Sequence, residues 1–314
     1  MIVDFRKLAN FVKIIDAGSI SRAAALLNTA QPALSQQLAA LEQHFGQKLL
    51  LRSNSGISPT QAGLVLYRHA QFMLKYLDQA TLDVERAGEV LTGHVSVGLA
   101  TYSASSTLSL PIIREVRRQH PGITVHINDS FGQILSELVM SGRMDMAVIY
   151  ASHPIKGTQL APLFTEELYY VCGTDQDALF APGAPIEVQA LKGVPLVLPG
   201  KGHFLRKLID DAFARARVEL EIAAEIESIS ALSEAVRTGI GGAILPLSVV
   251  LGTSGLERLS AHPLIKPAIS ADVALCTPDP LPMSEAALAV KAVLLQVVAD
   301  LPEHAAGRSI AKAL

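Results

Sequence analysis

The stretch that decides the fold of this chain is residues 5–63, FRKLANFVKIIDAGSISRAAALLNTAQPALSQQLAALEQHFGQKLLLRSNSGISPTQAG. Apolar residues recur at helical spacing over residues 8–15, and Gly18 ends that run. Ser19 is a favourable N-cap for a second short helix, and Pro32 opens a third helix that stops at a glycine. The polar run RSNSGISPT that follows predicts a loop or a small wing.

Three short helices joined by tight turns have the layout of a helix-turn-helix. Small residues in the second helix let it approach the third, whose leucines fill the shared core and leave polar side chains outside. Glutamine pairs bidentately with adenine, and the apolar carbons of proline contact a thymine methyl group. Any three-helix domain has an outer polar face. The spacing alone therefore leaves open the alternative that this face has no role in DNA binding. The predicted DNA contacts are Ser21, Arg22, Gln31, Pro32, Ser35, Gln36 and Arg52.

The net charge of −3 is unevenly distributed along the 314 residues. Residues 1–70 hold seven basic and three acidic side chains, a net charge of +4, which leaves −7 for the rest of the chain. A basic head on an acidic body suggests that the head meets a polyanion while the body has another task.

Residues 59–91 read as one long helix with an apolar seam. Its apolar side chains are spaced alternately four and three residues apart, which is the heptad pattern of paired helices. A single amphipathic helix lying on a core is the alternative, and the unbroken period favours self-association. A helix of about 30 residues is about 45 Å long and would separate the two ends of the protein. The seam continues through Ala87 and Leu91, and the predicted dimer contacts are Leu66, Ala70, Met73, Leu77, Ala80 and Val84.

From Gly93 onward the pattern changes to alternating strands and helices. HVSVGLA, ITVHIND and MDMAVIY predict strands with helices between them, an order typical of an α/β domain with a largely parallel sheet. LYYVCG and PLVLP predict further strands, followed by the helix FLRKLIDDAFARA. DVALCTP predicts a strand that returns to the first half, and EAALAVKAVLLQVVADL predicts the final helix.

Residues 5–63 resemble the winged helix-turn-helix of LysR-type transcriptional regulators. The resemblance extends over the chain, because that family continues with a long linker helix and a two-lobed α/β effector domain. The segments PALSQQLAALE, HVSVGLATYSASSTLSLP and EIESISAL are also similar, less specifically, to the nitrogen-assimilation-control branch. The matching positions are Phe11, Gly18, Ser19, Ala23, Ala24, Leu27, Gln31, Pro32, Ala33, Ser35, Leu41, Glu42, Gly46, Leu49, Arg52, Thr60, Ala62 and Gly63.

The resemblance implies an N-terminal all-α winged helix-turn-helix, a linker helix and a periplasmic-binding-protein-like (type 2) effector domain. It implies a homodimer or tetramer on two DNA half-sites, with RNA polymerase as a partner and a small-molecule effector between the lobes. The alternative is a regulator that needs no ligand and is controlled by its abundance. The implied domains are 1–58, 59–92 and 93–314, with lobe 1 at about 93–163 and 268–300 and lobe 2 at about 164–267.

Hydroxyl groups follow the first strand of the α/β half, where a helix begins. They and the helix N-terminal amides suit a carboxylate or phosphate, although such hydroxyls equally serve as helix caps. His203 is either a partner for an anionic ligand or a solvated loop residue. By the resemblance, the cleft between the lobes is the effector site, and its predicted residues are Thr101, Ser103, Ser105, Ser106, Ser130, Gln133, His203 and Ser230.

An enzyme and an exported solute-binding protein are the competing classes. The sequence holds no nucleotide-binding loop, HExxH or GxSxG motif, and its nine histidines form no ligand-spaced pair, so we expect no enzyme activity, cofactor or metal. The N-terminus lacks the apolar core of a signal peptide, which disfavours export. The two cysteines, Cys172 and Cys276, fit a reduced cytoplasmic setting, and no apolar run is long enough for a membrane helix.

Two positions depart from the family pattern. Gln36 stands where an arginine often follows the serine of the recognition helix, and Ser55 stands where the wing often has a second basic residue. Both departures remove positive charge that would contact phosphate, so Arg22, Arg52 and the helix N-termini have to supply more of the backbone contacts.

We therefore predict a shallower salt dependence of DNA binding than in a family member that retains both charges, because fewer counterions are released. Titration of a cognate duplex at several salt concentrations, beside such a family member, measures the slope. A slope as steep as that of the comparison protein would contradict the prediction.

Overall fold

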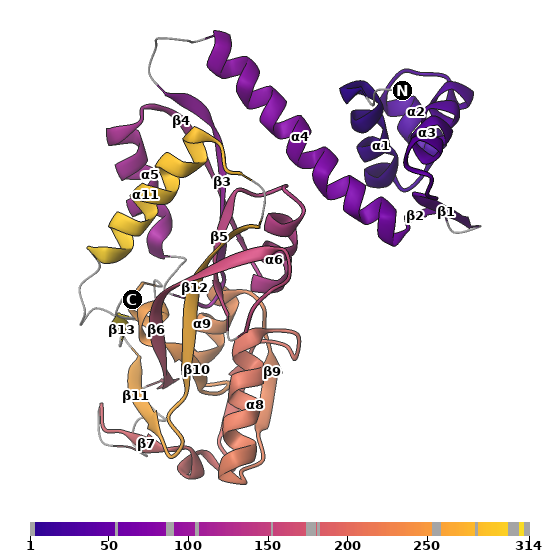
Figure 1. The fold of residues 1–314 in the computed structure, drawn as a ribbon. Coiled ribbons are helices and arrows are strands. Elements are labelled where there is room, and N and C mark those ends of the chain that lie inside the picture. The colour runs from indigo at the N-terminus through magenta and orange to yellow at the C-terminus, as the bar shows by residue number, and fades with distance from the viewer. Residues whose placement is uncertain are drawn as a thin grey trace.

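The computed structural model describes residues 4–53, 56–85, 91–103, 107–151, 153–173, 180, 183–252, 259–279, 282–300 and 308–310. Within these residues the chain has three parts: a small helical head, one long helix and an elongated α/β body (Figure 1). The long helix α4 (Gln61–Glu85) lies between the head and the body.

The head is a winged helix-turn-helix. Asp4 and Ser19 cap the first two helices by accepting hydrogen bonds from the backbone N–H groups of Lys7 and Arg22. Gly18 ends the first helix with a φ of 62°, which a glycine adopts without strain. The elements are α1 (Phe5–Ala17), α2 (Ile20–Leu26), α3 (Gln31–Phe45), β1 (Leu50–Ser53) and β2 (Gly56–Pro59).

A buried apolar cluster and one carboxylate hold the head together. Phe11, Ile14, Leu34 and Leu41 are almost fully buried and pack into one core. The Glu42 carboxylate at the end of α3 accepts hydrogen bonds from the backbone N–H groups of residues 49 and 50, at 2.9 and 3.4 Å, and from Lys48 at 2.7 Å. The wing is therefore attached to the third helix through this carboxylate.

The long helix contacts the head and the body with different faces. Ala70 is fully buried, and Leu66 packs on the core of the head. On another face, Lys75 Nζ lies 2.7 Å from the Asp145 carboxylate of the body, which also accepts from the N–H and hydroxyl of Ser96. With 25 residues the helix is about 37 Å long.

The body is built on a mixed sheet whose strand order is β4-β3-β5-β12-β6-β11-β7, with β10 and β13 (Arg308–Ile310) also paired to β6. The first three strands are parallel, as the β-α-β-α-β pattern predicts, and the helices α5, α6 and α11 pack on this half of the sheet. These elements are β3 (Thr92–Ala100), α5 (Ser109–Gln119), β4 (Gly122–Ser130), α6 (Gly132–Met140), β5 (Met146–Tyr150) and α11 (Glu285–Ala299).

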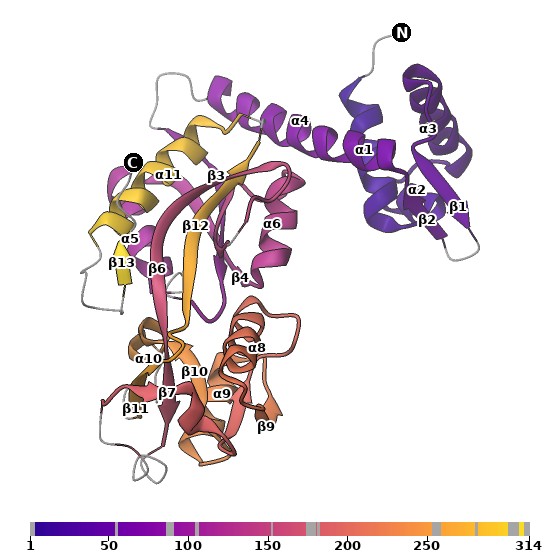
Figure 2. The same ribbon diagram turned by 60° about the horizontal axis from the view of Figure 1, so that its bottom comes forward.

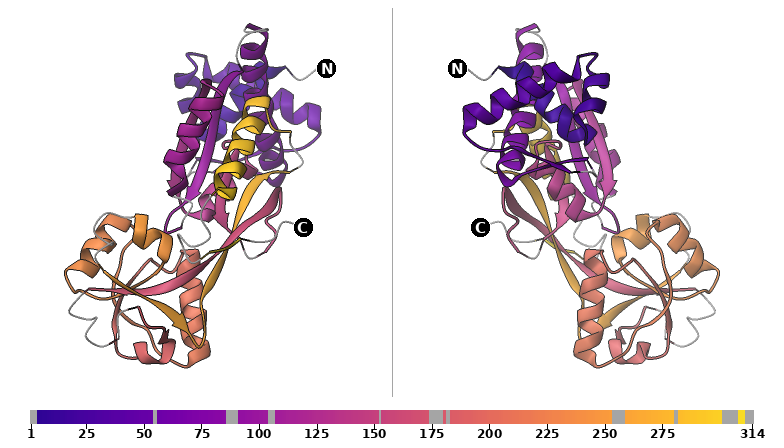
Figure 3. Two further views of the ribbon diagram at one scale, coloured as in Figure 1. Left: turned by 90° about the vertical axis from the view of Figure 1, so that its left-hand side faces the viewer. Right: turned by 90° about the vertical axis from the view of Figure 1, so that its right-hand side faces the viewer.

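Two lobes share this body (Figure 3). The strands β6 (Thr158–Cys172) and β12 (Ser270–Pro278) pair antiparallel and join the lobes (Figure 2). The second lobe has its own two-stranded parallel sheet of β8 and β9. Its elements are β7 (Ile186–Glu187), the 3₁₀ helix η2 (Val188–Leu191), β8 (Pro195–Leu198), α8 (Phe204–Ala216), β9 (Glu221–Glu225), α9 (Ile229–Arg237), β10 (Ala243–Pro246), α10 (Leu247–Gly252) and β11 (Ser260–Ile265).

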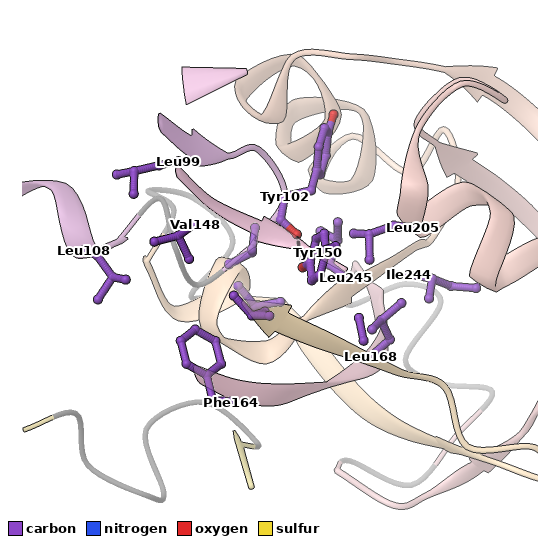
Figure 4. Close-up of a cluster of buried hydrophobic side chains, with 14 of the residues drawn as sticks. Leu99, Tyr102, Leu108, Val148, Tyr150, Phe164, Leu168, Leu205, Ile244 and Leu245 are labelled. Atoms are coloured by element: carbon purple, nitrogen blue, oxygen red, sulfur yellow. Dashed lines mark hydrogen bonds between the residues drawn. The ribbon is translucent and has the colours of Figure 1, made fainter. Parts of the chain in front are cut away.

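A buried carboxylate lies where β6 passes from one lobe to the other. Glu166 has no exposed surface, and its oxygens accept hydrogen bonds from the hydroxyl groups of Tyr150 and Ser103 in lobe 1 and of Ser248 in lobe 2, at 2.6, 3.1 and 3.0 Å. Burial and the neighbouring Glu166 raise the pKa of Tyr150 well above its ordinary value, so its hydroxyl remains a donor. Figure 4 shows the side chains of Tyr102 and Tyr150 within this junction.

The predicted fold class is confirmed, and most predicted elements are present. The helix at 204–216 and the strand at 94–100 lie where the sequence placed them. Two features differ. The strand expected at LYYVCG is the end of the 15-residue strand β6, and the described part of the linker helix ends at Glu85, with Ala87 outside the described residues.

We predict that Glu42→Gln loosens the wing by about 1–3 kcal/mol at pH 7, the range for hydrogen bonds to a charged group. Burial opposes ionisation of Glu42, but the bonds from Lys48 and the two backbone N–H groups lower its pKa below 4.5. A lowered pKa stabilises the fold above the unfolded value, so the difference between wild type and variant should disappear as the pH falls through the lowered pKa of Glu42. Hydrogen exchange at the amides of Leu49 and Leu50 measures it, with the exposed Gln43→Ala as control. Equal exchange in both proteins at pH 7 would contradict the prediction.

Candidate DNA-binding face and effector cavity

The third helix presents its N-terminal half to solvent. Gln31, Pro32 and Gln36 are exposed, whereas Leu34 and Leu38 on the opposite face are buried in the core of the head. The turn before this helix is tight because Asn28 adopts a φ of 50° and the Thr29 N–H bonds to a carbonyl of α2. The geometry is that of a recognition helix whose first turns project outward.

Positive charge flanks this exposed end. No side chain caps the N-terminus of α3, but only the Gln31 N–H of its first four residues is left for a phosphate, because Pro32 has no N–H and the N–H groups of Ala33 and Leu34 bond to the Ala30 carbonyl. Arg22 on α2 and Arg52 on the wing are exposed, and neither forms an ion pair within the described part of the chain. The sequence-predicted contacts therefore lie on three neighbouring elements of one domain: α2, α3 and the wing.

Ser35 and Ser21 differ in how far they are exposed. Ser35 is half-buried, and its hydroxyl accepts a hydrogen bond from the Gln31 side chain at 3.2 Å. The two side chains therefore present one linked polar surface. Ser21 is exposed at the start of α2. Ser55, the position of the missing wing charge, lies outside the described residues.

A cavity of about 660 Å³ lies between the lobes. This volume falls in the range of small-molecule sites. Its apolar walls include Phe131, Ile149 and Phe204. Thr101 also lines it, but the hydroxyl oxygen of this residue is itself buried and has no hydrogen-bond partner among the described residues. The charged lining residues are Glu137 from α6, Lys207 from α8 and Glu227 from the segment before α9.

Aromatic side chains join the lobes beside the cavity. The Tyr102 hydroxyl donates to the carbonyl of Ile226 at 2.8 Å. The His203 ring lies edge-on to Tyr102 and Phe131, with centroids 5.3 and 5.4 Å apart, and Tyr150 stacks on Phe204 at 5.4 Å. Contacts of the chain with itself thus cross the junction between the lobes.

His203 is buried, which excludes a solvated loop residue, and its Nδ1 accepts the backbone N–H of Leu205 to cap α8. Burial lowers the pKa of His203 to about 4, so the ring is neutral at pH 7. The residue lines the cavity, and its role as a partner of an anionic ligand stays a prediction.

The structure brings together only some of the predicted effector residues. Thr101, Gln133 and His203 line the cavity, but the Ser103 hydroxyl is fully buried and donates to Glu166. Ser130 and Ser230 are not among the residues that line it, and the Ser230 hydroxyl pairs with Ser228 at 2.9 Å. The expectation that Ser103, Ser130 and Ser230 present hydroxyls to the ligand is corrected accordingly. Ser105 and Ser106 lie outside the described residues.

Sequence reasoning missed the carboxylates and aromatics of the cavity. Glu137 lies one helical turn beyond Gln133, whose amide donates to it at 3.2 Å, and this spacing on α6 was a usable signal. Nothing local marks Glu227 or Phe204, because they reach the cavity only when the second lobe packs against the first.

The predicted dimer seam is divided. Leu66, Ala70 and Met73 face the head, where Leu66 and Met73 border a small cavity of about 170 Å³ with residues of α1 and α3. Farther along, Leu77 is 40% and Val84 77% exposed, and Ala80 is half-buried. The first half of the helix therefore lies on a core, as the alternative reading expected. Leu77 and Val84 in the other half are exposed in this chain, and their pairing with a second helix stays a prediction.

The described residues contain no cluster of three or more His, Cys, Asp or Glu side chains that could hold a metal ion. None of their helices has the length and hydropathy needed to span a membrane. Cys172 and Cys276 are buried and form no disulfide.

Family models match nearly the whole chain. Residues 5–64 match the bacterial regulatory helix-turn-helix protein of the lysR family, and residues 88–299 match the LysR substrate binding domain. The nitrogen assimilation regulatory protein nac of Escherichia coli K12 is 38% identical over 298 residues, which cover 95% of this chain and 96% of that protein. Its counterpart in Klebsiella aerogenes is 37% identical, with coverage of 94% and 95%.

Solved structures share the fold. Full-length OxyR from Pseudomonas aeruginosa matches over the whole of both chains with a TM-score of 0.73 at 22% identity. Full-length CbnR complexed with its target DNA matches with a TM-score of 0.54 at 22% identity, covering 94% of this chain and 100% of that one. These proteins share with this chain the order of head, linker helix and two-lobed body.

We predict that Gln36→Ala weakens binding to a cognate duplex by about 1–3 kcal/mol and leaves binding to random DNA nearly unchanged, because a lost base contact affects only the cognate site. Fluorescence anisotropy of the full chain on both duplexes measures the difference. Gln43→Ala, an exposed glutamine near the other end of α3, is the matched control. Equal loss on both duplexes would assign Gln36 to the DNA backbone.

Proposed function

Because the chain belongs to the LysR family of DNA-binding transcriptional regulators, we propose that it binds paired half-sites as an oligomer and responds to a small molecule in the cavity between its lobes. RNA polymerase as a partner and the cytoplasm as its location belong to the same proposal. So do the domain limits 1–58, 59–92 and 93–314. The observation that carries the proposal is the exposed, uncapped N-terminal half of α3 flanked by Arg22 and Arg52.

DNA recognition combines two kinds of contact. The two arginines and the Gln31 N–H at the start of α3 suit phosphates, which fix the position of the head on the duplex. Gln31, Ser35 and Gln36 carry the hydrogen-bonding groups that distinguish bases in the major groove. With few charges on the recognition helix, one head alone makes few phosphate contacts, so a second head on the same DNA would raise the affinity of the pair.

The second half of the α4 seam supports self-association. Leu77 and Val84 expose apolar surface, and Leu66 and Met73 open onto the small cavity that Phe5, Leu8 and Phe45 complete. A second copy of the chain carries the same strip, and a two-fold pairing would cover both strips at once. Pairing would remove these apolar side chains from water, and the hydrophobic effect would then stabilise the oligomer.

The cavity supports the responsive half of the proposal. Its size, its apolar walls and the few polar side chains in its lining are features of a small-molecule site. Strands β6 and β12 pass between the lobes, so a ligand that contacts both lobes biases their relative position. Lys75 and Asp145 connect lobe 1 to the linker helix, which gives that bias a route to the head.

One observation favours the alternative, a regulator that is controlled by its abundance. The bond from Tyr102 to the Ile226 carbonyl and the stack of Tyr150 on Phe204 hold the lobes together without any ligand. Genome-wide mapping of bound DNA, combined with a shift assay of the full chain on the recovered sites, tests the regulator itself. Repeating the shift assay with metabolites suggested by neighbouring genes separates the two modes of control.

We predict that the double variant Leu77→Asp, Val84→Asp dissociates the oligomer and abolishes specific DNA binding, because four buried carboxylates per dimer would lack partners. Sedimentation velocity and a shift assay of the same samples measure both effects. Ile240→Asp, which charges an apolar residue 52% exposed in lobe 2, is the control. If the double variant stays oligomeric and binds normally, the seam is not the interface.

A further inference from the structure

A second cavity lies between the linker helix α4 and lobe 1. Its volume is about 210 Å³, and it shares no lining residue with the cavity between the lobes. One wall is a face of α4, and the others come from the start of β3, the turn before β5, the end of β12 and the residues just before α11. We call this space the linker cavity.

Three contacts hold α4 against lobe 1 around this space. Lys75 Nζ lies 2.7 Å from the Asp145 carboxylate, and the Gln79 amide donates to a backbone carbonyl at the start of β3 at 3.1 Å. Gly142 lies so close to α4 that a Cβ atom there would be 3.5 Å from the backbone of Phe72. A molecule in the linker cavity would therefore touch both the linker helix and the body.

Most of the lining is apolar, and part of it is aromatic. The rings of Phe72 and Tyr76 stack with an interplanar angle of 19° and centroids 6.0 Å apart, so they present an aromatic wall. Met144 and Met283 add thioether groups, which pack favourably at the edges of aromatic rings, and two prolines complete the apolar surface. These groups suit an aromatic ring better than a flexible polar chain.

Most polar groups of this lining are used within the chain. Lys75 is the only lysine or arginine in the described lining, and its ammonium is paired with Asp145, whose carboxylate also accepts from the N–H and hydroxyl of Ser96. Gln79 is buried and bonded to β3, and Ser284 accepts the backbone N–H that it caps in α11. Among the described lining residues, no lysine or arginine is therefore free to balance a carboxylate.

Apart from the Tyr76 hydroxyl, the remaining polar residues of the lining are Asp78 and His94, and both are exposed. The His94 ring stacks on His126, with centroids 6.1 Å apart. An ion pair with an exposed carboxylate such as Asp78 contributes only about 0–1 kcal/mol, which does not compensate an amine for lost hydration. An uncharged ligand whose hydroxyl group stays in water avoids this cost.

The proposed dimer seam uses another face of α4. Phe72, Tyr76 and Gln79 recur at the spacing of one helix face. The seam residues Met73 and Leu77 each follow by one position, which is about 100° around the helix. Pairing through the seam would therefore not fill the linker cavity.

The volume of the linker cavity decides what kind of occupant fits. An apolar cavity of about 150 Å³ in another protein binds benzene. A cavity of about 210 Å³ therefore accommodates a single ring that carries a small substituent. A helix, with a diameter of about 10 Å including its side chains, is too large for it.

We propose that the linker cavity binds a neutral, single-ring aromatic compound, with its ring against Phe72 and Tyr76 and its polar substituent toward the solvent near His94. This site is separate from the proposed effector cavity and does not rest on it. Because the ligand would bury apolar surface of both α4 and lobe 1, it would strengthen their attachment. The chain would thus have a second small-molecule response, at the point where the body meets the helix that carries the head.

Ligand-observed NMR titration of the full chain with benzyl alcohol, benzoate, benzylamine and cyclohexylmethanol at neutral pH tests the proposal. We expect saturable binding of benzyl alcohol, about tenfold tighter than that of the two charged analogues, which lose hydration without a free partner. It should also exceed that of the non-aromatic alcohol several-fold, because that alcohol lacks contacts between rings. Equal binding of a charged analogue would overturn the neutral charge, equal binding of cyclohexylmethanol the aromatic class, and no saturable binding of benzyl alcohol the site itself.

Two tryptophan reporters locate the compound, because the chain has no tryptophan of its own. Tyr76→Trp places the fluorophore in the linker cavity, and Ile134→Trp, at a residue that is 45% exposed, places it in the lining of the cavity between the lobes. We expect benzyl alcohol to shift the emission of Tyr76→Trp saturably and to leave that of Ile134→Trp unchanged. Equal responses, or the reverse pattern, would overturn the assignment to the linker cavity.

A third variant removes part of the aromatic wall. Tyr76→Ser should weaken benzyl alcohol about tenfold, because the contact with this ring is lost. The control Leu110→Ser, at a residue 69% exposed on α5, should bind as the wild type does. Tyr76 is itself 50% exposed, so both variants should fold, which their thermal unfolding curves check. Unchanged binding by a folded Tyr76→Ser would overturn the proposal.

A segment of the chain itself is the competing occupant. Leu281 lies outside the described residues and precedes Pro282, which lines the linker cavity. Binding of benzyl alcohol that appears only in Leu281→Ala would show that this segment fills the space, and would overturn the proposal. None of these outcomes tests the cavity between the lobes or the DNA-binding face, so failure of the linker site would leave the proposed function in place.

Discussion

The body depends on the satisfaction of one buried carboxylate. Glu166 has no access to water, and a buried ionised group without partners costs several kcal/mol. Its hydrogen bonds come from Ser103, Tyr150 and Ser248, which belong to three separate elements of two lobes. The lobes therefore cannot separate fully at this point without exposing or stranding the carboxylate, and the cavity beside it keeps its walls at a defined separation.

The hydrogen bonds to Glu166 also decide which hydroxyl groups after β3 are used within the fold. Ser103 and Thr101 lie two residues apart after β3, and both had been expected to contact a ligand. The Ser103 hydroxyl donates to Glu166, whereas Thr101 belongs to the lining of the cavity. The different surroundings of these two similar side chains are set by a residue more than sixty positions away in the chain.

Local chemistry made the head and most elements predictable. Ser19, Gly18 and Pro32 mark helix ends through capping, left-handed backbone and a fixed φ, effects that act within a few residues. The long strand β6 was not predictable in full, because Pro162 and the adjacent Glu166 and Glu167 resemble a solvated loop. The cavity was only partly predictable for a related reason: Glu227 and Phe204 acquire their roles when distant segments pack. Likewise, the α4 period indicates a partner surface but does not say whether that partner is the chain's own first helix or a second copy.

The separate cores bear on how this chain could be recombined with its relatives. The head has an apolar cluster of its own, which reaches only the start of α4, whereas one continuous cluster runs from Val95 in lobe 1 to Leu245 in lobe 2. A graft that exchanges the head within α4 interrupts a single helix and the Lys75 contact. A graft that exchanges one lobe cuts through that shared cluster and removes a donor from Glu166. The unit of modular exchange in this architecture is therefore the whole sensor, and diversification of its two lobes has to proceed in step.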